Sequence, residues 1–171
     1  RSWALDAQRS LSFRGRYLKI TQVPDRWQSW FVAGVLDGLR TLRGTRFDAI
    51  FSTFPIATAH LIGLALHRMT RLPWVADFRD PMAQVGYPRD PLVWRAYDWI
   101  ERRVFRYAAR VLVTTNGAWD FYARKYGAEG AAKTVVVGNG FDEALFDGIP
   151  DARAEVRDPR ERVVLLHSGL L

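Results

Sequence analysis

The chain has 171 residues, of which 49% are hydrophobic and 13% aromatic, enough to fill the core of one domain and to exclude a disordered protein. It has no cysteine, which excludes disulfides and thiolate metal sites, and its three histidines lack ligand spacing with neighbouring carboxylates. No window approaches the roughly 18 apolar residues of a membrane-spanning helix, and RSWALDAQRS at the start lacks a signal-peptide core. We therefore expect a cytosolic domain with no structural metal and no cofactor.

The net charge of +7 is concentrated in the amino-terminal part. Residues 1–46 hold nine basic and three acidic residues, whereas residues 47–171 hold 16 basic and 15 acidic ones. A basic segment can attract anionic lipid or nucleic acid, because its field concentrates polyanions at the surface. Genome composition is the alternative explanation, since arginine outnumbers lysine by 22 to three. No aromatic-basic interleaving and no nucleic-acid reader motif is present, so we do not expect a nucleic-acid partner.

The first predicted helix covers residues 25–43, directly after Pro24. Its apolar residues recur at spacings of three and four and form one face: Trp27, Trp30, Phe31, Gly34, Val35, Leu39 and Leu42. This face either packs on a sheet or, with its basic flank, contacts an anionic membrane at the inner face of the plasma membrane.

A short strand is predicted over residues 47–52. Pro55 then opens a helix, 56–69, whose apolar residues surround it almost completely and predict burial.

The segment WVADFRDP, residues 74–81, is an apolar run that ends abruptly in charges. Its Trp and Val favour a buried strand over 74–78, which places Asp77, Arg79 and Asp80 at the carboxyl end, where α/β sheets bind ligands.

A proline-rich loop over the strand ends, 81–91, follows. Next come a helix over 92–107, a strand over 110–115, a helix over 118–126 and a strand over 134–137. This alternation predicts an α/β fold, a Rossmann-like parallel sheet with helices on both faces.

Four parts are expected along the chain. Residues 1–46 form a basic amphipathic segment of the same domain as residues 47–147, the Rossmann-like domain itself. Residues 148–162 are charged and contain proline, which is typical of a linker. Residues 163–171, VVLLHSGLL, predict the first strand of a second domain, so we expect the chain to be part of a longer one.

The charged group at the end of the strand over 74–78 is the leading candidate site. The planar fork of Arg79 suits phosphate or sugar oxygens, and a carboxylate such as Asp80 can accept hydrogen bonds from sugar hydroxyls. Asp77 shares a strand face with Arg79, which suits an orienting ion pair. The alternative is a local salt-bridged turn without function.

Other candidates lie at neighbouring strand ends. Thr53 and Pro55 lead into a helix amino terminus, whose free N–H groups attract anions, although Thr53 could equally cap that helix. His60, one turn into the helix, is either a substrate contact or a hydrogen-bonded core residue. Asn139 and Gly140 are expected first of all in a tight turn after the strand over 134–137.

Glu101 has several arginines beside it on the predicted helix over 92–107. We interpret it as one member of a surface or helix-packing ion pair with these neighbours.

Several motifs occur together in the order and spacing of one known family. They are FDAIFSTFP at 47–55, a helix bearing His60, PWVADFRDP at 73–81, Glu101 ahead of RYAARVLVTT, and VVVGNGFD at 135–142. In these the chain resembles the amino-terminal domain of retaining glycosyltransferases of family 4, which have the GT-B architecture of two facing Rossmann-like domains. The DFRD form is similar to a subset of such enzymes in polysaccharide assembly.

The resemblance implies that this half binds the acceptor, while a second domain binds the nucleotide-sugar donor. It also implies that the turn at Asn139 and Gly140 faces the cleft between the two domains, where a substrate contact is its secondary role. The family's paired glutamates and diphosphate-binding residues belong to that second domain, of which VVLLHSGLL resembles the first strand and glycine turn. Many relatives carry a histidine where this chain has Arg79. Transfer with retention in the family needs no protein nucleophile, so this difference is compatible with activity.

The sequence therefore predicts part of a retaining glycosyltransferase that transfers a sugar from a nucleotide-sugar to a glycan or lipid-linked acceptor, inactive as the isolated chain. The alternative is a non-catalytic α/β module that binds an anionic small molecule in the same place.

Overall fold

A computed structural model of the chain describes residues 23–148. The chain divides into two compact units, Arg1–Asn139 and Gly140–Leu171. The first unit contains, in order, α1 (Trp30–Gly44), β1 (Ile50–Thr53), α2 (Ala57–Thr70), β2 (Trp74–Arg79), α3 (Pro91–Tyr107), β3 (Arg110–Val113), α4 (Asn116–Lys133) and β4 (Thr134–Val136). The second contains the short 3₁₀ helix η3 (Glu143–Phe146). The strand predicted at 163–171 and nearly all of the linker predicted at 148–162 lie outside the described residues.

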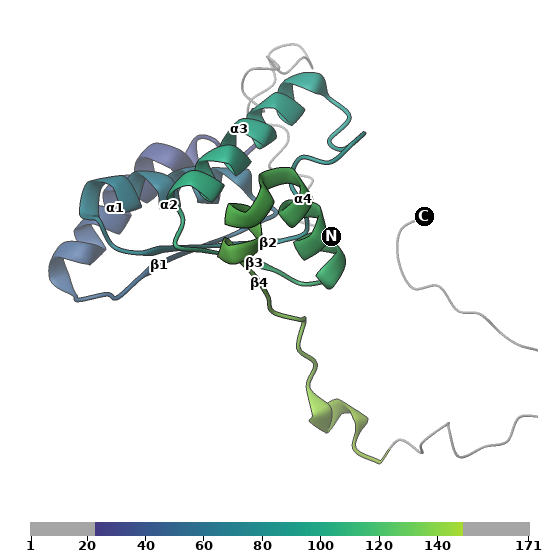
Figure 1. Cartoon of the computed structure of the whole chain (residues 1–171). Coiled ribbons are helices and arrows are strands. Elements are labelled where there is room, and N and C mark those ends of the chain that lie inside the picture. The colour runs from purple at the N-terminus through teal and green to yellow at the C-terminus, as the bar shows by residue number, and fades with distance from the viewer. Residues whose placement is uncertain (1–22, 149–171) are drawn as a thin grey trace, which may run out of the picture. The chain divides into compact units, whose positions relative to one another are not determined.

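The four strands form one parallel sheet in the order β1-β2-β3-β4, which confirms the α/β class and the Rossmann-like parallel sheet (Figure 1). Every predicted helix and strand of this unit is present. The largest difference is α4, which continues beyond residue 126 to Lys133 across a break at Gly127, where a positive φ of 63° suits a residue without a side chain.

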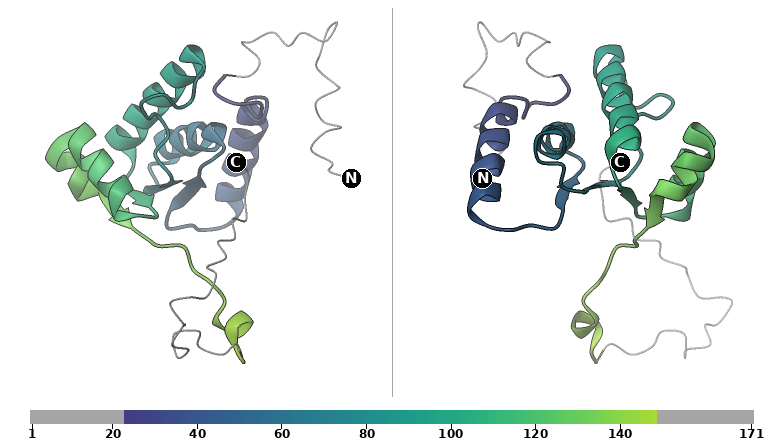
Figure 2. Two further views of the ribbon diagram at one scale, coloured as in Figure 1. Left: turned by 90° about the vertical axis from the view of Figure 1, so that its right-hand side faces the viewer. Right: turned by 60° about the vertical axis from the view of Figure 1, so that its left-hand side comes forward.

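Helices α1–α4 form a layer on one side of the sheet, whereas the sequence predicted helices on both faces (Figures 1 and 2). The reason is the strand order. Because each strand lies beside the one that precedes it in the chain, every right-handed crossover moves in the same direction and places its helix on the same side.

Burial alternates along the strands accordingly. In β2, Trp74, Ala76 and Phe78 are buried beneath the helices, while Val75 and Asp77 on the other face are partly exposed. In β1, Phe51 on the same open face is 61% exposed. The prediction of a buried strand at 74–78 therefore holds for every second residue, because side chains of a strand point alternately to its two faces.

Helix α1 packs on α2 through two glycines. A Cβ at Gly34 would lie 2.6 Å from Ile62 Cδ1, and a Cβ at Gly38 would lie 2.7 Å from Leu66 Cδ1. Only part of the apolar face predicted for this helix takes part in the packing. Trp30 is 52% exposed and Phe31 37%, so these two aromatic side chains face outward at the amino-terminal end.

The amino termini of α2 and α3 are capped in different ways. Asp90 caps α3 locally, its Oδ1 accepting from the backbone N–H groups of Leu92 and Val93 at 2.8 and 3.2 Å. Helix α2 has no local side-chain cap; instead Asp25 accepts from the backbone N–H of Thr58 at 2.8 Å and from its hydroxyl at 2.9 Å. A carboxylate from the segment before α1 thus occupies the amino terminus of α2.

Within residues 23–148, none of the helices has the length and hydropathy needed to cross a bilayer.

Candidate functional site

A hollow of about 670 Å³ lies at the carboxyl ends of the strands. All four strands contribute to its lining through the residues that follow or end them. The lining comprises Phe54 and Pro55 after β1, Arg79, Asp80 and Pro81 at the end of β2, Thr114 after β3, Asn139 after β4, and Gln84 and Tyr87 from the loop between β2 and α3. We call it the strand-end pocket, and its position is the one at which open α/β sheets bind ligands.

Arg79, one of the residues that line this pocket, has a backbone conformation that residues with a side chain rarely adopt. Its φ is 55°, and the parallel register shifts between Asp77 and Arg79. The neighbouring groups hold this conformation: Asp77 Oδ1 accepts from the Arg79 N–H at 3.2 Å, and the Thr114 hydroxyl donates to the Arg79 carbonyl oxygen at 2.9 Å. Such strain costs about 1–3 kcal/mol and is concentrated at functional sites in proteins.

The strained turn directs two charged side chains to the surface. Arg79 and Asp80 are both exposed, and within the described part of the chain neither the guanidinium nor the carboxylate has a hydrogen-bond or ion-pair partner. The local salt bridge that the sequence left open as an alternative is therefore not formed. The predicted ion pair between Asp77 and Arg79 is wrong as well, because Asp77 binds the Arg79 backbone rather than its side chain.

Thr53 and Pro55 end β1 beside this turn. The Thr53 hydroxyl donates to Asp77 Oδ2 at 2.9 Å and does not cap α2, so Thr53 supports the carboxylate that holds Arg79. Pro55, which follows a cis peptide bond, lines the pocket. The free N–H groups expected at the start of α2 are partly taken by Asp25, which leaves this helix end less able to bind an anion.

His60 is fully buried and does not line the strand-end pocket. Its Nδ1 lies 2.8 Å from the Ser52 hydroxyl oxygen, which accepts from the Trp74 indole N–H at 2.8 Å, and its ring packs edge-on against Phe78. Burial lowers the pKa of His60 from 6.5 to about 3, so the ring is neutral at neutral pH. This placement matches the core alternative, and we leave His60 out of the site.

Asn139 lines the strand-end pocket, whereas Gly140 begins the second unit and stays a prediction as a substrate contact. Sequence reasoning did not single out Gln84 and Tyr87. They come from the loop predicted to lie over the strand ends, and nothing in their spacing showed which of its residues would face inward. For Thr114, the sequence left open a place in the lining or a cap of the next helix, because Thr114 ends the predicted strand over 110–115. Thr114 lines the pocket, whereas Thr115 caps α4.

A second hollow, about 690 Å³, lies at the opposite edge of the sheet. Its lining comes from the end of α1, the segment before β1 and the end of α2, and includes Arg43, Arg46 and Asp48. We favour the strand-end pocket as the functional one, because only there do the loops after all four strands converge. Among residues 23–148, no group of three His, Asp or Glu side chains could hold a metal ion.

The strand-end pocket combines a cation and a carboxylate that have no side-chain partner within residues 23–148, hydroxyl groups and two aromatic rings. A guanidinium donates to phosphate or hydroxyl oxygens in a planar fork, and a carboxylate accepts from hydroxyl groups. The pocket is therefore suited to a polar ligand that carries hydroxyl groups with or without a phosphate.

Comparison with known proteins gives a family and a fold. The glycosyl transferase 4-like domain family matches residues 4–140, which covers the whole first unit as far as it is described. No curated protein matches the chain. Among solved structures, the chain is similar to the crystal structure of Anabaena HepE in complex with UDP and glucose, with 20% sequence identity and a TM-score of 0.51.

This structural match covers 66% of the present chain and 27% of the HepE chain, so the chain spans about a quarter of the length of that protein. At this identity the likeness concerns the fold alone, and it agrees with the parallel sheet described above. The family match extends over most of the sequence, and the chain thus belongs to the glycosyl transferase 4-like domain family.

Proposed function

We propose that this chain is the acceptor-side domain of a retaining glycosyltransferase of GT-B architecture. The enzyme would transfer a sugar from a nucleotide-sugar to a glycan or lipid-linked acceptor during polysaccharide assembly. The observation that carries the proposal is the strand-end pocket, in which the side chains of Arg79 and Asp80 are exposed and have no partner among the described residues. Family membership supports glycosyl transfer, and HepE, the structural neighbour, was crystallised with UDP and glucose.

In this proposal Arg79 and Asp80 touch the substrates. The bond between the anomeric carbon and the diphosphate oxygen breaks, an acceptor oxygen bonds to the same face of the sugar, and the acceptor proton passes to the departing diphosphate. The Arg79 guanidinium would stabilise the negative charge that develops on the leaving group or its sugar, since preorganised donors act where charge develops. The Asp80 carboxylate would orient a sugar hydroxyl, and Asn139 would contribute an amide on the facing wall.

The donor would be held mainly by a second domain, because the present chain spans only 27% of its structural neighbour. We therefore expect the purified 171-residue chain to have no transferase activity with any nucleotide-sugar. Turnover by the chain alone would contradict the proposal that the donor is bound mainly by a second domain.

The catalytic proposal is tested by substitution in the full-length protein that contains this domain. We expect Arg79→Ala and Asp80→Ala to lower turnover at least tenfold while the melting temperature changes little, because exposed charges contribute only about 0–1 kcal/mol to folding. Arg46→Ala is the matched control, since Arg46 is an exposed arginine at the opposite edge of the sheet. A fall in melting temperature with turnover intact would show that the strand-end charges are structural.

The non-catalytic alternative predicts a different result. A binding module would bind an anionic ligand in an Arg79-dependent manner, detectable by calorimetry with UDP or inorganic diphosphate, yet the full-length protein would transfer no sugar.

We also propose that the domain acts at the cytoplasmic face of an anionic membrane that carries the acceptor. The support lies on α1, where Trp30, Phe31, Val32 and Leu36 are exposed and Arg40 and Arg43 follow in its last turns. Interfacial helices combine such apolar anchors with basic residues. Sedimentation with vesicles tests this: binding should require anionic lipid and weaken with salt, and equally poor sedimentation with neutral and anionic vesicles at low salt would contradict it.

A further inference from the structure

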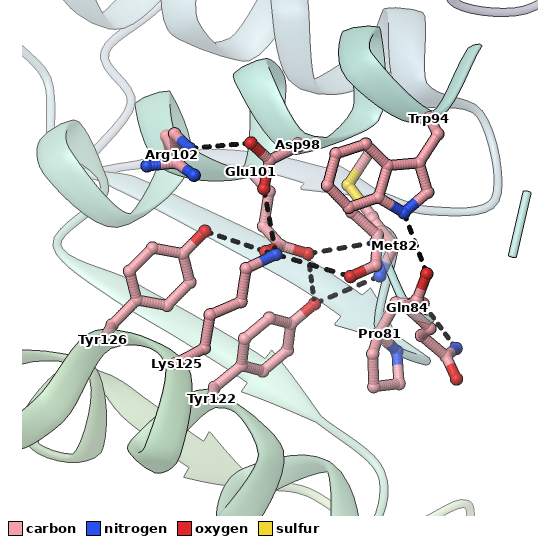
Figure 3. Close-up of polar contacts among 11 residues, drawn as sticks. Pro81, Met82, Gln84, Trp94, Asp98, Glu101, Arg102, Tyr122, Lys125 and Tyr126 are labelled. Carbon is pink, nitrogen blue, oxygen red and sulfur yellow. Dashed lines mark hydrogen bonds and ion pairs between the residues drawn. The ribbon is translucent and has the colours of Figure 1, made fainter. Parts of the chain in front are cut away.

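Glu101 of α3 is the centre of a buried polar cluster, where the sequence had predicted a surface or helix-packing pair with neighbouring arginines. Its side chain is fully buried, and its partners come from α4 rather than from its own helix (Figure 3). Oε1 accepts from Lys125 Nζ at 2.5 Å and from the Tyr126 hydroxyl at 2.8 Å. Oε2 accepts from the Tyr122 hydroxyl at 3.2 Å. Lys125 also pairs with Asp98 at 3.1 Å.

The same cluster binds the backbone that follows β2. The Ala83 N–H donates to Glu101 Oε2 at 3.2 Å, and the Met82 N–H donates to the Tyr122 hydroxyl at 3.2 Å. Lys125 Nζ in turn donates to the Ala83 carbonyl oxygen at 3.3 Å. Three backbone polar groups of Met82 and Ala83 are thus hydrogen-bonded to side chains of the cluster, and both residues are buried.

The ionisation states fit these donor and acceptor roles. Burial, followed by the charge of Glu101, raises the pKa of Tyr122 well above its ordinary value, which keeps the hydroxyl protonated and able to donate. Although partial burial opposes it, hydrogen bonds from Arg102 and Lys125 hold the pKa of Asp98 below its ordinary value.

Met82 and Ala83 belong to the loop between β2 and α3, which forms one wall of the strand-end pocket. Pro81, just before these two residues, and Gln84, just after them, both line the pocket, as does Tyr87. Gln84 is itself fixed by two hydrogen bonds. Its side-chain amide donates to the Pro81 carbonyl oxygen at 2.8 Å, and its backbone carbonyl oxygen accepts from the Trp94 indole N–H at 2.8 Å. The loop tip at Val85 and Gly86 is exposed and outside the pocket lining.

We propose that Glu101, with Lys125 and Tyr122, is a positioning residue for substrate binding. The buried cluster holds Met82 and Ala83 and thereby sets the place of Pro81, Gln84 and Tyr87 in the pocket wall. None of the three touches the pocket itself, so their effect passes through the loop backbone. This inference rests on the proposed function, because it assigns the loop to the acceptor side of that site.

The test compares substitutions at two tyrosines that both bind Glu101. Tyr122→Phe and Tyr126→Phe each remove a hydroxyl that binds Glu101, but only the Tyr122 hydroxyl also binds the loop. Amide hydrogen exchange in the 171-residue chain should therefore accelerate at least tenfold at Met82 in Tyr122→Phe and remain within twofold of the parent in Tyr126→Phe. Equal acceleration in both variants, or in neither, would overturn the proposal.

Kinetics of the full-length protein give the second readout. A loosened pocket wall weakens ground-state and transition-state binding alike, so Tyr122→Phe should raise KM for the acceptor several-fold while kcat stays within twofold. A merely structural role would lower the active fraction, and hence the apparent kcat, without changing KM; that result would overturn the positioning role. If the parent protein transfers no sugar, the proposed function fails, while the exchange comparison still decides whether the cluster holds the loop.

Discussion

Two groups of charged residues, some twenty positions apart in the sequence, have opposite environments in this domain. At the end of β2, Arg79 and Asp80 are exposed and have no side-chain partner within residues 23–148. Between α3 and α4, Glu101 is fully buried and both of its oxygens accept hydrogen bonds. An exposed charge can remain unpaired because water solvates it, whereas a buried charge must be paired and hydrogen-bonded.

The strand-end charges and the buried cluster around Glu101 contribute to the strand-end pocket in different ways. The strand-end charges are available to a ligand, and the backbone conformation at Arg79 that accompanies them is strained. The buried cluster is not available, and it fixes the loop that completes the pocket. Substitutions should therefore affect stability at the buried cluster and ligand binding at the strand end, and the following predictions test that separation in order of expected effect.

The largest effect on stability is expected for Lys125→Met. Removing the cation leaves the Glu101 carboxylate buried without its charge partner, which typically destabilises a protein by about 3–5 kcal/mol. Urea unfolding of the 171-residue chain measures the free energy of unfolding directly. Arg102→Met is the control, because it removes the exposed partner of Asp98, and its effect should be much smaller. Similar losses in both variants would contradict the distinction between buried and exposed pairs.

His60 should make the domain sensitive to mild acid. The pKa of His60 is about 3 in the folded chain and its ordinary value is 6.5. Between these pH values the imidazole is therefore protonated in the unfolded chain and neutral in the folded chain. Stability contributed by the neutral ring is present above pH 6.5 and is lost as the pH falls, by at most about 1.4 kcal/mol per pH unit.

The variant His60→Gln tests this, since glutamine does not titrate. The drop in unfolding free energy between pH 6.5 and pH 4.5 should be smaller by roughly 2–3 kcal/mol than in the parent chain. An identical pH slope in parent and variant would show that another group causes the acid sensitivity.

The smallest effect concerns the strained turn at the pocket. Arg79→Gly and Arg79→Ala both remove the guanidinium, but only glycine, which has no Cβ, adopts a φ of 55° without a steric clash. We expect Arg79→Gly to be more stable than Arg79→Ala by about 1 kcal/mol in urea unfolding, while both lose turnover in the full-length protein. Equal stability of the two variants would indicate that the turn is not strained.

Local patterns in the sequence predicted the helices and strands of the first unit, because spacing, capping residues and turn residues act over a few positions. They also placed Arg79 and Pro55 near one another, because the carboxyl ends of parallel strands meet at one edge of the sheet. Both residues line the strand-end pocket, together with Asn139. The predicted ion pair of Asp77 with Arg79 was wrong, because the partner was inferred from a charged neighbour in the sequence. Glu101 does form a helix-packing ion pair, but with Lys125 of α4 rather than with the arginines beside it in the sequence.

The sequence by itself thus determined the class of the fold, the order of its elements and the edge of the sheet at which the strand-end pocket lies. Only the tertiary structure decided which partner each polar group takes. Asp25 caps a helix 33 residues away, Thr53 binds Asp77 across 24 residues, and Lys125 binds Glu101 across 24. Such pairs depend on the strand order and the layer of helices above the sheet, so no pattern of adjacent residues contains them. Burial follows from the same packing, and it separates a charge that can meet a ligand from one that holds the loop in place.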